Sequence, residues 1–418
     1  MRSATKLQSG RERGLLGSLG WVAAGSMAAN LAAYVVYLGA SQWLGPGDFG
    51  QFARLLSAML ILGVPALALQ SVIAREVVRG ADIARMRALT TQTTEVVTAA
   101  LVIAVPVVVW ILRVSFNSAL AALCTAPLLV VIAGAQGVLQ GAGEFRGLAW
   151  VLALVGAART VPVIIALAVG AGPAGALWAG TAGAAVAAAA AWVVVVAATR
   201  PTGTSGSTAG ADAAGTTVGS VLRASQVQLV LVVAVSVDLL LSGTVLDDAG
   251  AGVYALGAIA TKAAFWLPQA IGVVFYPRLA DAARSRASLR QALLVVAGIG
   301  VTLTALAALI GPLIPWVLGE EYRPVVPIAW LFTYTGAAMA VLQVLLLAAI
   351  AADRTRVALI TWCVVIAEVI VIVTAVHSVA VLAATAAVSV TIAAALTAIA
   401  ARSAVRYVHR DHADNSQP

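Results

Sequence analysis

Twelve long apolar runs occupy almost the whole of this 418-residue chain. A helix needs about 20 apolar residues to cross the hydrocarbon core of a bilayer, and each run is at least that long. No segment between the runs is long enough to form a soluble catalytic domain. The sequence therefore predicts a protein that works within a membrane and is not an enzyme. We place the runs at Leu15–Leu44, Phe49–Val78, Ala88–Leu112, Ser118–Gln140, Leu148–Val169, Gly175–Thr199, Val221–Leu246, Gly252–Tyr276, Leu289–Leu318, Val325–Ala352, Val357–Val376 and Val379–Ala401.

The composition indicates helices as the spanning elements. Hydrophobic residues make up 62% of the chain and charged residues 10%, which is typical of a bundle of membrane helices. Only helices and closed barrels satisfy their backbone hydrogen bonds in lipid. Strands of a barrel would alternate with a period of two over about ten residues, and these runs do not. We expect an all-α integral membrane protein with twelve transmembrane helices and no cleaved signal peptide.

The basic residues predict the orientation of these helices. If the N-terminus is cytoplasmic, 20 of the 25 Lys and Arg residues fall in the cytoplasmic segments. The opposite loops hold only Arg113 and Arg323, and three more cations lie within spans. Cytoplasmic loops carry an excess of Lys and Arg, so both termini are predicted to face the cytoplasm. This topology also accounts for the net charge of +8, and nucleic-acid binding is not needed to explain it.

A segment at 200–220, rich in Gly, Ser, Thr and Ala, separates six runs from six and reads as a flexible cytoplasmic linker. The predicted domains are an N-terminal six-helix bundle (1–199), this linker, a C-terminal six-helix bundle (221–402) and a tail (403–418). Both halves start on the same side, so the bundles would form a parallel repeat about a pseudo-twofold axis. Chance similarity between helices punctuated by Gly and Pro is the alternative. The repeat pairs Gly50, Phe52, Pro65 and Arg75 with Gly252, Tyr254, Pro268 and Arg278.

Three short motifs resemble one known family. They are QWLGPGDFGQFA at 42–53, VDLLL at 237–241 and VLGEEY at 317–322. In this order and spacing they resemble the polysaccharide-export branch of the multidrug/oligosaccharidyl-lipid/polysaccharide flippase superfamily, over about residues 15–400. The resemblance implies an O-antigen flippase-like protein of polysaccharide biosynthesis. Such a protein turns undecaprenyl-diphosphate-linked oligosaccharides from the inner to the outer leaflet. The lipid II flippase branch usually has two further helices, which this chain lacks.

The substrate that this resemblance implies suggests binding residues. Diphosphate oxygens accept charge-assisted hydrogen bonds, and a charge within a span costs about 2.5–3.5 kcal/mol unless it has a partner or faces a cavity. We expect Arg159 and Lys262 to face a cavity between the two bundles, with a structural ion pair as the alternative for each. Arg54 lies close enough to a membrane surface either to reach water or to face this cavity. The candidate substrate-binding residues, which include polar side chains for the sugars, are Arg159, Lys262, Arg54, Asn30, Tyr34, Tyr37 and Gln70.

Three acids within the runs are candidates for ion coupling: Asp238, Glu368 and Glu95. Burial disfavours the charged form of a carboxyl group, so a buried acid can carry a proton or hold a cation. The coupling ion would be H+ or Na+. A salt bridge to Arg159 or Lys262 is the alternative role for these acids.

Other sources of energy and chemistry have no motif here. A nucleotide-binding P-loop requires Gly-Lys followed by Ser or Thr, and neither Lys6 nor Lys262 follows a glycine. No metal-ligand or cofactor motif is present, so no cofactor is expected. The expected partners are the lipid-linked glycan, membrane lipids, the coupling ion and polysaccharide assembly proteins. Two other functions stay open: a cation-coupled multidrug antiporter of the same superfamily, or a polysaccharide polymerase, which usually has a larger outer loop.

Overall fold

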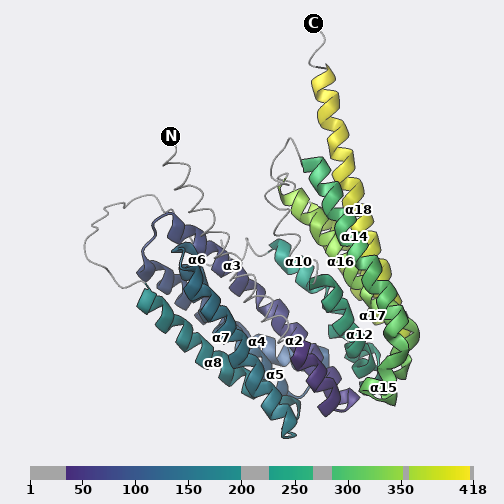
Figure 1. Cartoon of the computed structure of the whole chain (residues 1–418), viewed down its shortest axis with the longest axis horizontal. Coiled ribbons are helices and arrows are strands. Elements are labelled where there is room, and N and C mark those ends of the chain that lie inside the picture. Colours follow the sequence, from purple (N-terminus) through teal and green to yellow (C-terminus); the bar gives the residue numbers. More distant parts are fainter. Residues whose placement is uncertain (1–33, 199–225, 267–284, 352–356, 415–418) are drawn as a thin grey trace, which may run out of the picture. The chain divides into compact units, whose positions relative to one another are not determined.

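The computed structural model describes residues 34–198, 226–266, 285–351 and 357–414, and these residues form helices and no strands (Figure 1). Ten candidate membrane spans lie in these ranges and coincide with ten of the twelve predicted runs. The other two runs, Leu15–Leu44 and Gly252–Tyr276, lie partly outside the described residues, as do Asn30 and the whole 200–220 linker.

The contacts between residues divide the chain into two compact units. Unit 1 comprises Met1–Leu44 and Ala58–Gln226, and unit 2 comprises Gly45–Ser57 and Val227–Pro418. The helices of unit 1 are α3 (Val64–Val78), α4 (Ile83–Leu112), α5 (Phe116–Leu123), α6 (Thr125–Gly141), α7 (Phe145–Ala168) and α8 (Gly172–Ala198). Those of unit 2 are α10 (Gln226–Ala234), α11 (Val237–Val245), α12 (Asp248–Trp266), α14 (Ser285–Ile310), η1 (Gly311–Leu313), α15 (Ile314–Leu318), η2 (Glu320–Ile328), α16 (Ala329–Ala351), α17 (Val357–Ala375) and α18 (Val379–Asp414). Helix α2 (Pro46–Leu62) begins in unit 2 and ends in unit 1.

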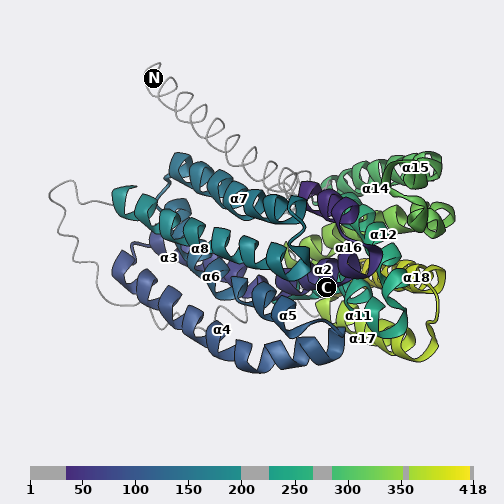
Figure 2. The same cartoon turned by 90° about the horizontal axis from the view of Figure 1, so that it is seen from below.

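Unit 1 is held together by close packing of neighbouring helices. Helix α7 lies against α8, and α3 lies against α6 (Figure 2). A Cβ atom added at Gly183 of α8 would overlap the Ala158 carbonyl of α7, so only glycine permits this approach. Small residues at such crossings are the usual means of packing in lipid, where the hydrophobic effect does not drive helices together.

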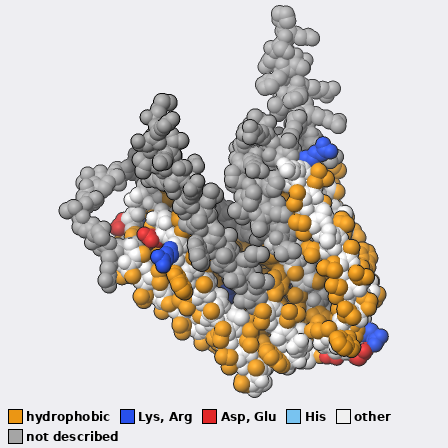
Figure 3. Space-filling view, viewed as in Figure 1, with side chains coloured by type: hydrophobic (Ala, Val, Ile, Leu, Met, Phe, Trp, Pro, Cys, Tyr) orange, Lys and Arg blue, Asp and Glu red, His pale blue; other side chains and the backbone are white. Residues whose placement is uncertain are grey.

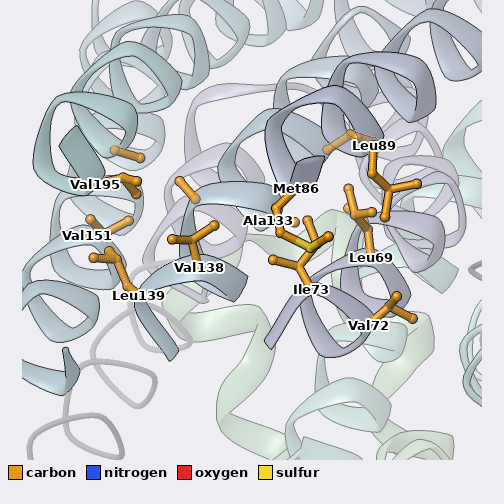
Figure 4. Close-up of a cluster of buried hydrophobic side chains, with 14 of the residues drawn as sticks. Leu69, Val72, Ile73, Met86, Leu89, Ala133, Val138, Leu139, Val151 and Val195 are labelled. Carbon is orange, nitrogen blue, oxygen red and sulfur yellow. The ribbon is translucent and has the colours of Figure 1, made fainter. Parts of the chain in front are cut away.

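The core of unit 1 consists of aliphatic side chains that point inward from α3, α4, α6, α7 and α8 (Figure 4). Leu69 and Ile73 of α3 are fully buried, and they share this cluster with Met86 of α4 and Val138 of α6. The side chains form an apolar interior with no ionisable member among the buried residues of the cluster. Unit 1 therefore places its charges elsewhere.

Helix α12 is the most enclosed helix of unit 2. Every residue from Ala251 to Ile259 is buried, and α12 contacts α11, α16, α18 and η2. The first part of α2 also packs on α12, because a Cβ atom at Gly252 would overlap the carbonyl of Pro46. The sequence analysis assigned Gly45–Ser57 to the N-terminal bundle, whereas its contacts place this segment with unit 2. The glycines at 50 and 252 explain the difference, since they allow the two backbones to approach closely.

Two membrane runs are irregular near their middle. In the second run α2 ends and α3 begins at Gly63, whose φ of −78° and ψ of −13° stay helical, and Pro65 in the first turn of α3 cannot donate a backbone hydrogen bond. The seventh run breaks between α10 and α11, at Ser236, whose φ of −131° is not helical. A break of the second kind frees backbone groups inside a membrane, where such groups can bind ions or polar ligands.

The visible surface of the described residues is largely apolar, and charged side chains gather at a few places near helix ends (Figure 3). Trp110, Trp316 and Leu309 are among the most exposed large side chains, at 82%, 88% and 78%. Such exposure is unfavourable in water but normal against lipid. It fits the prediction of an integral membrane protein.

Candidate functional site

Among the described residues of unit 2, four buried side chains carry a formal charge when ionised near neutral pH. Arg54 of α2 is 1% exposed, and Asp238 of α11, Lys262 of α12 and Glu368 of α17 are each 4% exposed. They carry two positive and two negative formal charges, so the group is balanced when all four are ionised. Each charge would cost about 2.5–3.5 kcal/mol at the centre of a membrane helix without a partner. The arrangement of their partners therefore decides what the group can do.

Asp238 lies directly after the break between α10 and α11. Its Oδ1 accepts a hydrogen bond of 2.7 Å from the Leu239 amide, and its Oδ2 accepts one of 2.5 Å from the Tyr254 hydroxyl. Its position in the first turn of α11 is favourable for a negative charge, because the amino end of a helix carries a partial positive charge. The break thus produces an acceptor site inside the membrane run.

Lys262 is the cation that faces this acid. Its Nζ donates a 2.6 Å hydrogen bond to the Ser57 hydroxyl of α2, and Ser57 in turn donates to the Ala53 carbonyl at 3.0 Å. The charges of Lys262 and Asp238 are close enough to attract each other. Lys262 therefore lies inside unit 2 near Asp238. This environment fits the alternative role predicted for Lys262, a structural partner of a buried acid. Its contact with substrate stays a prediction.

Glu368 is the fourth charge of this group. It belongs to the buried face of α17, together with Thr361, Val365 and Ile372. Its charge is close enough to that of Asp238 for the two carboxylates to repel each other. No hydrogen bond or ion pair holds the Glu368 carboxylate within the described residues. Two neighbouring acids, of which one lacks a partner, form a group that can take up a proton or a cation.

Arg54 of α2 lies between two glycines, Gly50 and Gly243. Its Nε donates to the Gly50 carbonyl at 3.3 Å, and its Nη1 has no hydrogen-bond partner among the described residues. A Cβ atom at Gly243 of α11 would overlap this Nη1, so the guanidinium occupies the space that a side chain at 243 would fill. Of the two predicted alternatives for Arg54, access to water at the membrane surface is wrong, because its side chain is buried within unit 2. Its role in a substrate cavity stays a prediction.

Three buried hydroxyls on the helices of unit 2 were not singled out from the sequence. Ser236, Thr361 and Thr397 have fully buried side chains whose oxygens lack a hydrogen-bond partner in the described part of the chain. Ser236 stands at the helix break two residues before Asp238, and Thr361 precedes Glu368 by two turns on the buried face of α17. Thr397 belongs to α18, which packs on both α17 and α11. The seven-residue spacing of Thr361 and Glu368 was the available sequence signal for this face.

The other predicted site residues that the structure describes lie in unit 1. Arg159 of α7 is half-buried and has no ion-pair partner among the described residues. Gln70 donates to the Oε1 of Gln140 at 3.2 Å. Tyr34 is half-buried and Tyr37 is buried, near the start of the described chain. The binding roles of these residues stay predictions.

The sequence analysis treated Glu95 as a buried acid, and this is wrong. Glu95 is exposed on α4, where it lines an open cavity of unit 1. Only 17% of the residues in the most apolar part of α4 are buried, so most of the helix surface is available to lipid or water. Hydropathy along the chain could not reveal which side of the helix Glu95 occupies.

The fold is similar to that of solved membrane transporters. No protein-family model matches the sequence, and no curated protein matches it. An inward-facing multidrug resistance MATE family transporter of the MOP superfamily gives a TM-score of 0.67 at 13% identity, covering 92% of this chain and 96% of that one. The lipid II flippase MurJ, in an inward closed conformation, gives 0.65 at 9% identity over 90% of this chain and 87% of that one. A MOP superfamily transporter from Pyrococcus furiosus gives 0.59 at 11% identity over 93% and 95%.

At these identities the likeness concerns the fold alone. The predicted fold class is confirmed: the described residues are all helical, and the similar structures have twelve membrane helices in two six-helix bundles. The polysaccharide-export branch is not shown by them. The chain has the fold of MOP superfamily transporters.

Proposed function

We propose that this protein is a membrane flippase that moves a lipid-linked oligosaccharide, or a related cell-envelope polysaccharide precursor, from the inner to the outer leaflet by alternating access. It would use a cation gradient as its source of energy. The observation that carries the coupling is the buried group of Asp238, Lys262 and Glu368 beside a broken membrane helix. The sequence has no P-loop for nucleotide-driven transport, and an interior acid pair provides an exchangeable site for H+ or Na+.

The ion site that we propose consists of the two acids and the hydroxyl of Ser236. Asp238 and Glu368 supply carboxylate oxygens, while Ser236, two residues before Asp238, supplies a buried hydroxyl oxygen without a partner in the described residues. Hard cations such as Na+ bind oxygen ligands of these kinds, and a proton binds the acids alone. Lys262 stands near Asp238 and would compete with the ion for its charge.

Cations support the choice of an anionic substrate. Arg159 is half-buried in α7 without an ion-pair partner in the described residues, and a guanidinium stays charged when it leaves water. A diphosphate group would satisfy such a cation with several charge-assisted hydrogen bonds. Arg159 is therefore the residue on which the substrate class depends most directly.

A cation-coupled multidrug antiporter is the second candidate function. The similarity in fold to a MATE multidrug transporter and the buried acids of unit 2 favour it. In that case the acids would bind an organic cation directly, and Arg159 would have no role with substrate. A transport assay with both substrate classes separates the two functions.

Transport in proteoliposomes tests this proposal. A fluorescent polyprenyl-diphosphate oligosaccharide is expected to cross between leaflets faster when an H+ or Na+ gradient is imposed. Glu368→Gln is expected to lower the rate to that seen without a gradient, because the amide keeps the shape of the side chain and cannot take up the ion. Arg159→Ala is expected to slow the diphosphate lipid, and Arg159→Lys to restore it only in part, because Lys lacks the planar fork.

Matched controls lie on the same unit as Arg159. Arg146→Ala and Glu144→Gln change exposed charges near the start of α7 and are expected to leave transport unchanged. Transport of ethidium with no movement of the diphosphate lipid would refute the flippase and favour the antiporter. An undiminished rate in Arg159→Ala would remove this residue from the substrate site.

We also propose that both termini face the cytoplasm of a bacterial plasma membrane, on the basis of the asymmetry of Lys and Arg. Reporter domains fused after Arg13, within 202–215 and after Arg410 are all expected to report the cytoplasm. A reporter within 202–215 that responds as an external domain would contradict six spans in the first half. Fusions after Arg113, which would report the outside, provide the matched control.

A further inference from the structure

The described part of unit 1 contains an open cavity of about 650 Å³ that belongs neither to the buried charges of unit 2 nor to Arg159. Helix α4 forms one wall with Arg87, Thr90, Thr91, Thr94, Glu95 and Thr98, and the opposite wall includes Val131 of α6 and Trp192 of α8. Helix α4 runs along one edge of unit 1 (Figure 2). The cavity therefore combines two opposite charges, a stripe of hydroxyls and an aromatic ring.

The hydroxyls offer acceptors to a ligand. Thr90, Thr91, Thr94 and Thr98 each donate their proton to the carbonyl four residues earlier in α4, over 2.8, 3.0, 2.8 and 2.7 Å. With the proton engaged, each oxygen presents only lone pairs to the cavity. The carboxylate of Glu95 adds a negative charge and two more acceptor oxygens. This end of the cavity suits a ligand group that is positively charged and donates several hydrogen bonds.

The other end of the cavity suits an anion. The guanidinium of Arg87 lies over the ring of Trp192, with 5.2 Å between its Cζ and the ring centroid. The Trp192 indole is itself fixed, because its Nε1 donates to the Val131 carbonyl at 3.1 Å. Stacking leaves the edge of a guanidinium free to donate hydrogen bonds in its plane. Eight residues, or about 12 Å of helix, separate Arg87 from Glu95.

Apolar surface continues from the cavity along α4. Val96, Val102 and Ile103 are exposed by 51%, 77% and 70%, and they follow Glu95 towards the middle of the span. Arg87 lies in the second turn of α4, near the end that the basic residues predict to be cytoplasmic. A phospholipid held here would keep its phosphate at the level of the headgroups, direct the rest of its headgroup into the cavity towards Glu95, and lay its acyl chains along the helix.

We propose that this cavity binds the headgroup of a phospholipid with a primary ammonium group, as in phosphatidylethanolamine. Arg87 binds the phosphate, and Glu95 with the threonine oxygens accepts hydrogen bonds from the ammonium. A trimethylammonium group, as in phosphatidylcholine, has the same charge and no proton to donate. An anionic lipid without an amine leaves Glu95 unpaired and places its own charge near it. The site thus selects the lipid by hydrogen bonding and not by charge alone.

Native mass spectrometry of the full chain tests this assignment. Delipidated protein in detergent is titrated with phosphatidylethanolamine, phosphatidylcholine and phosphatidylglycerol that carry identical acyl chains. The wild type is expected to bind the ethanolamine lipid about tenfold more tightly than the choline lipid, the factor that one good hydrogen bond to a charged group provides. Glu95→Gln and Thr94→Val are each expected to reduce this preference. Arg87→Ala is expected to weaken all three lipids.

The controls are exposed charges outside the cavity, Glu144→Gln for the acid and Arg146→Ala for the cation, and both are expected to keep the preference. Free phosphoethanolamine is expected to compete with the lipid, and inorganic phosphate to compete much less. Equal affinity of the wild type for the three lipids would overturn the proposal. So would an unchanged preference in Glu95→Gln, or competition by phosphate as strong as that by phosphoethanolamine.

Discussion

Asp238→Asn and Lys262→Met, made singly, are each expected to lower the free energy of unfolding by about 1–3 kcal/mol, the usual cost of losing one partner of a buried hydrogen bond. Asp238 accepts from Tyr254 and Lys262 donates to Ser57, and both charged side chains are 4% exposed, so each substitution also leaves the other charge less compensated. The double variant is expected to cost clearly less than the two single variants together, because neither unpaired charge remains. Unfolding in mixed micelles, followed by tryptophan fluorescence, measures the three differences.

An exposed ion pair of the same unit serves as the control for this cycle. Nη2 of Arg323 lies 2.6 Å from Oε2 of Glu320, and both side chains are 69% exposed. Removing either partner there is expected to change the free energy of unfolding by less than about 1 kcal/mol, as is usual for surface pairs. Strictly additive costs for Asp238 and Lys262 would show that the two charges do not depend on each other. The buried group would then be two separate sites.

Gly252→Ala is expected to lower the free energy of unfolding by about 1–3 kcal/mol through overpacking. The added methyl group would overlap the Pro46 carbonyl, so the start of α2 has to move away from α12. This movement would also carry Ser57 away from Lys262, and transport is expected to fall together with stability. Thermal unfolding in detergent and the flipping assay measure the two effects.

Gly298→Ala of α14 is the matched control, because a Cβ atom at that position meets no atom within 4 Å. Alanine in an open helical position is expected to raise stability by up to about 1 kcal/mol, since it reduces the freedom of the unfolded chain. Equal effects of the two substitutions would mean that the contact of α2 with α12 does not hold unit 2 together.

Helix α2 belongs to both units of the chain. A duplication of six helices would be expected to give two units that divide at the 200–220 linker. Instead, residues Gly45–Ser57 pack with unit 2 while the rest of α2 packs with unit 1. The segment supplies Arg54 and Ser57 to the buried charges of unit 2. Helix α2 therefore runs from the coupling site that we propose to the junction with α3 at Gly63.

The sequence by itself determined the positions of the membrane helices. Ten candidate spans of the structure coincide with predicted runs, because a bilayer imposes a minimum length of apolar sequence that can be read directly from the chain. The junction of α2 and α3 at Gly63 could also be predicted from the sequence, since Pro65 cannot donate a backbone hydrogen bond. The list of ionisable residues within the runs was likewise available from the sequence.

Only the tertiary structure decided which of these residues meet. Lipid is as apolar as a helix interface, so the two sides of a membrane helix do not differ in hydropathy, and the period that marks a buried face in soluble proteins is weak. This is why hydropathy did not show that Glu95 is exposed and Arg54 buried, as the structure has them. The break at Ser236 has no Gly or Pro to mark it. Its position, and the neighbours of Asp238 that it brings together, follow from contacts between helices far apart in the sequence.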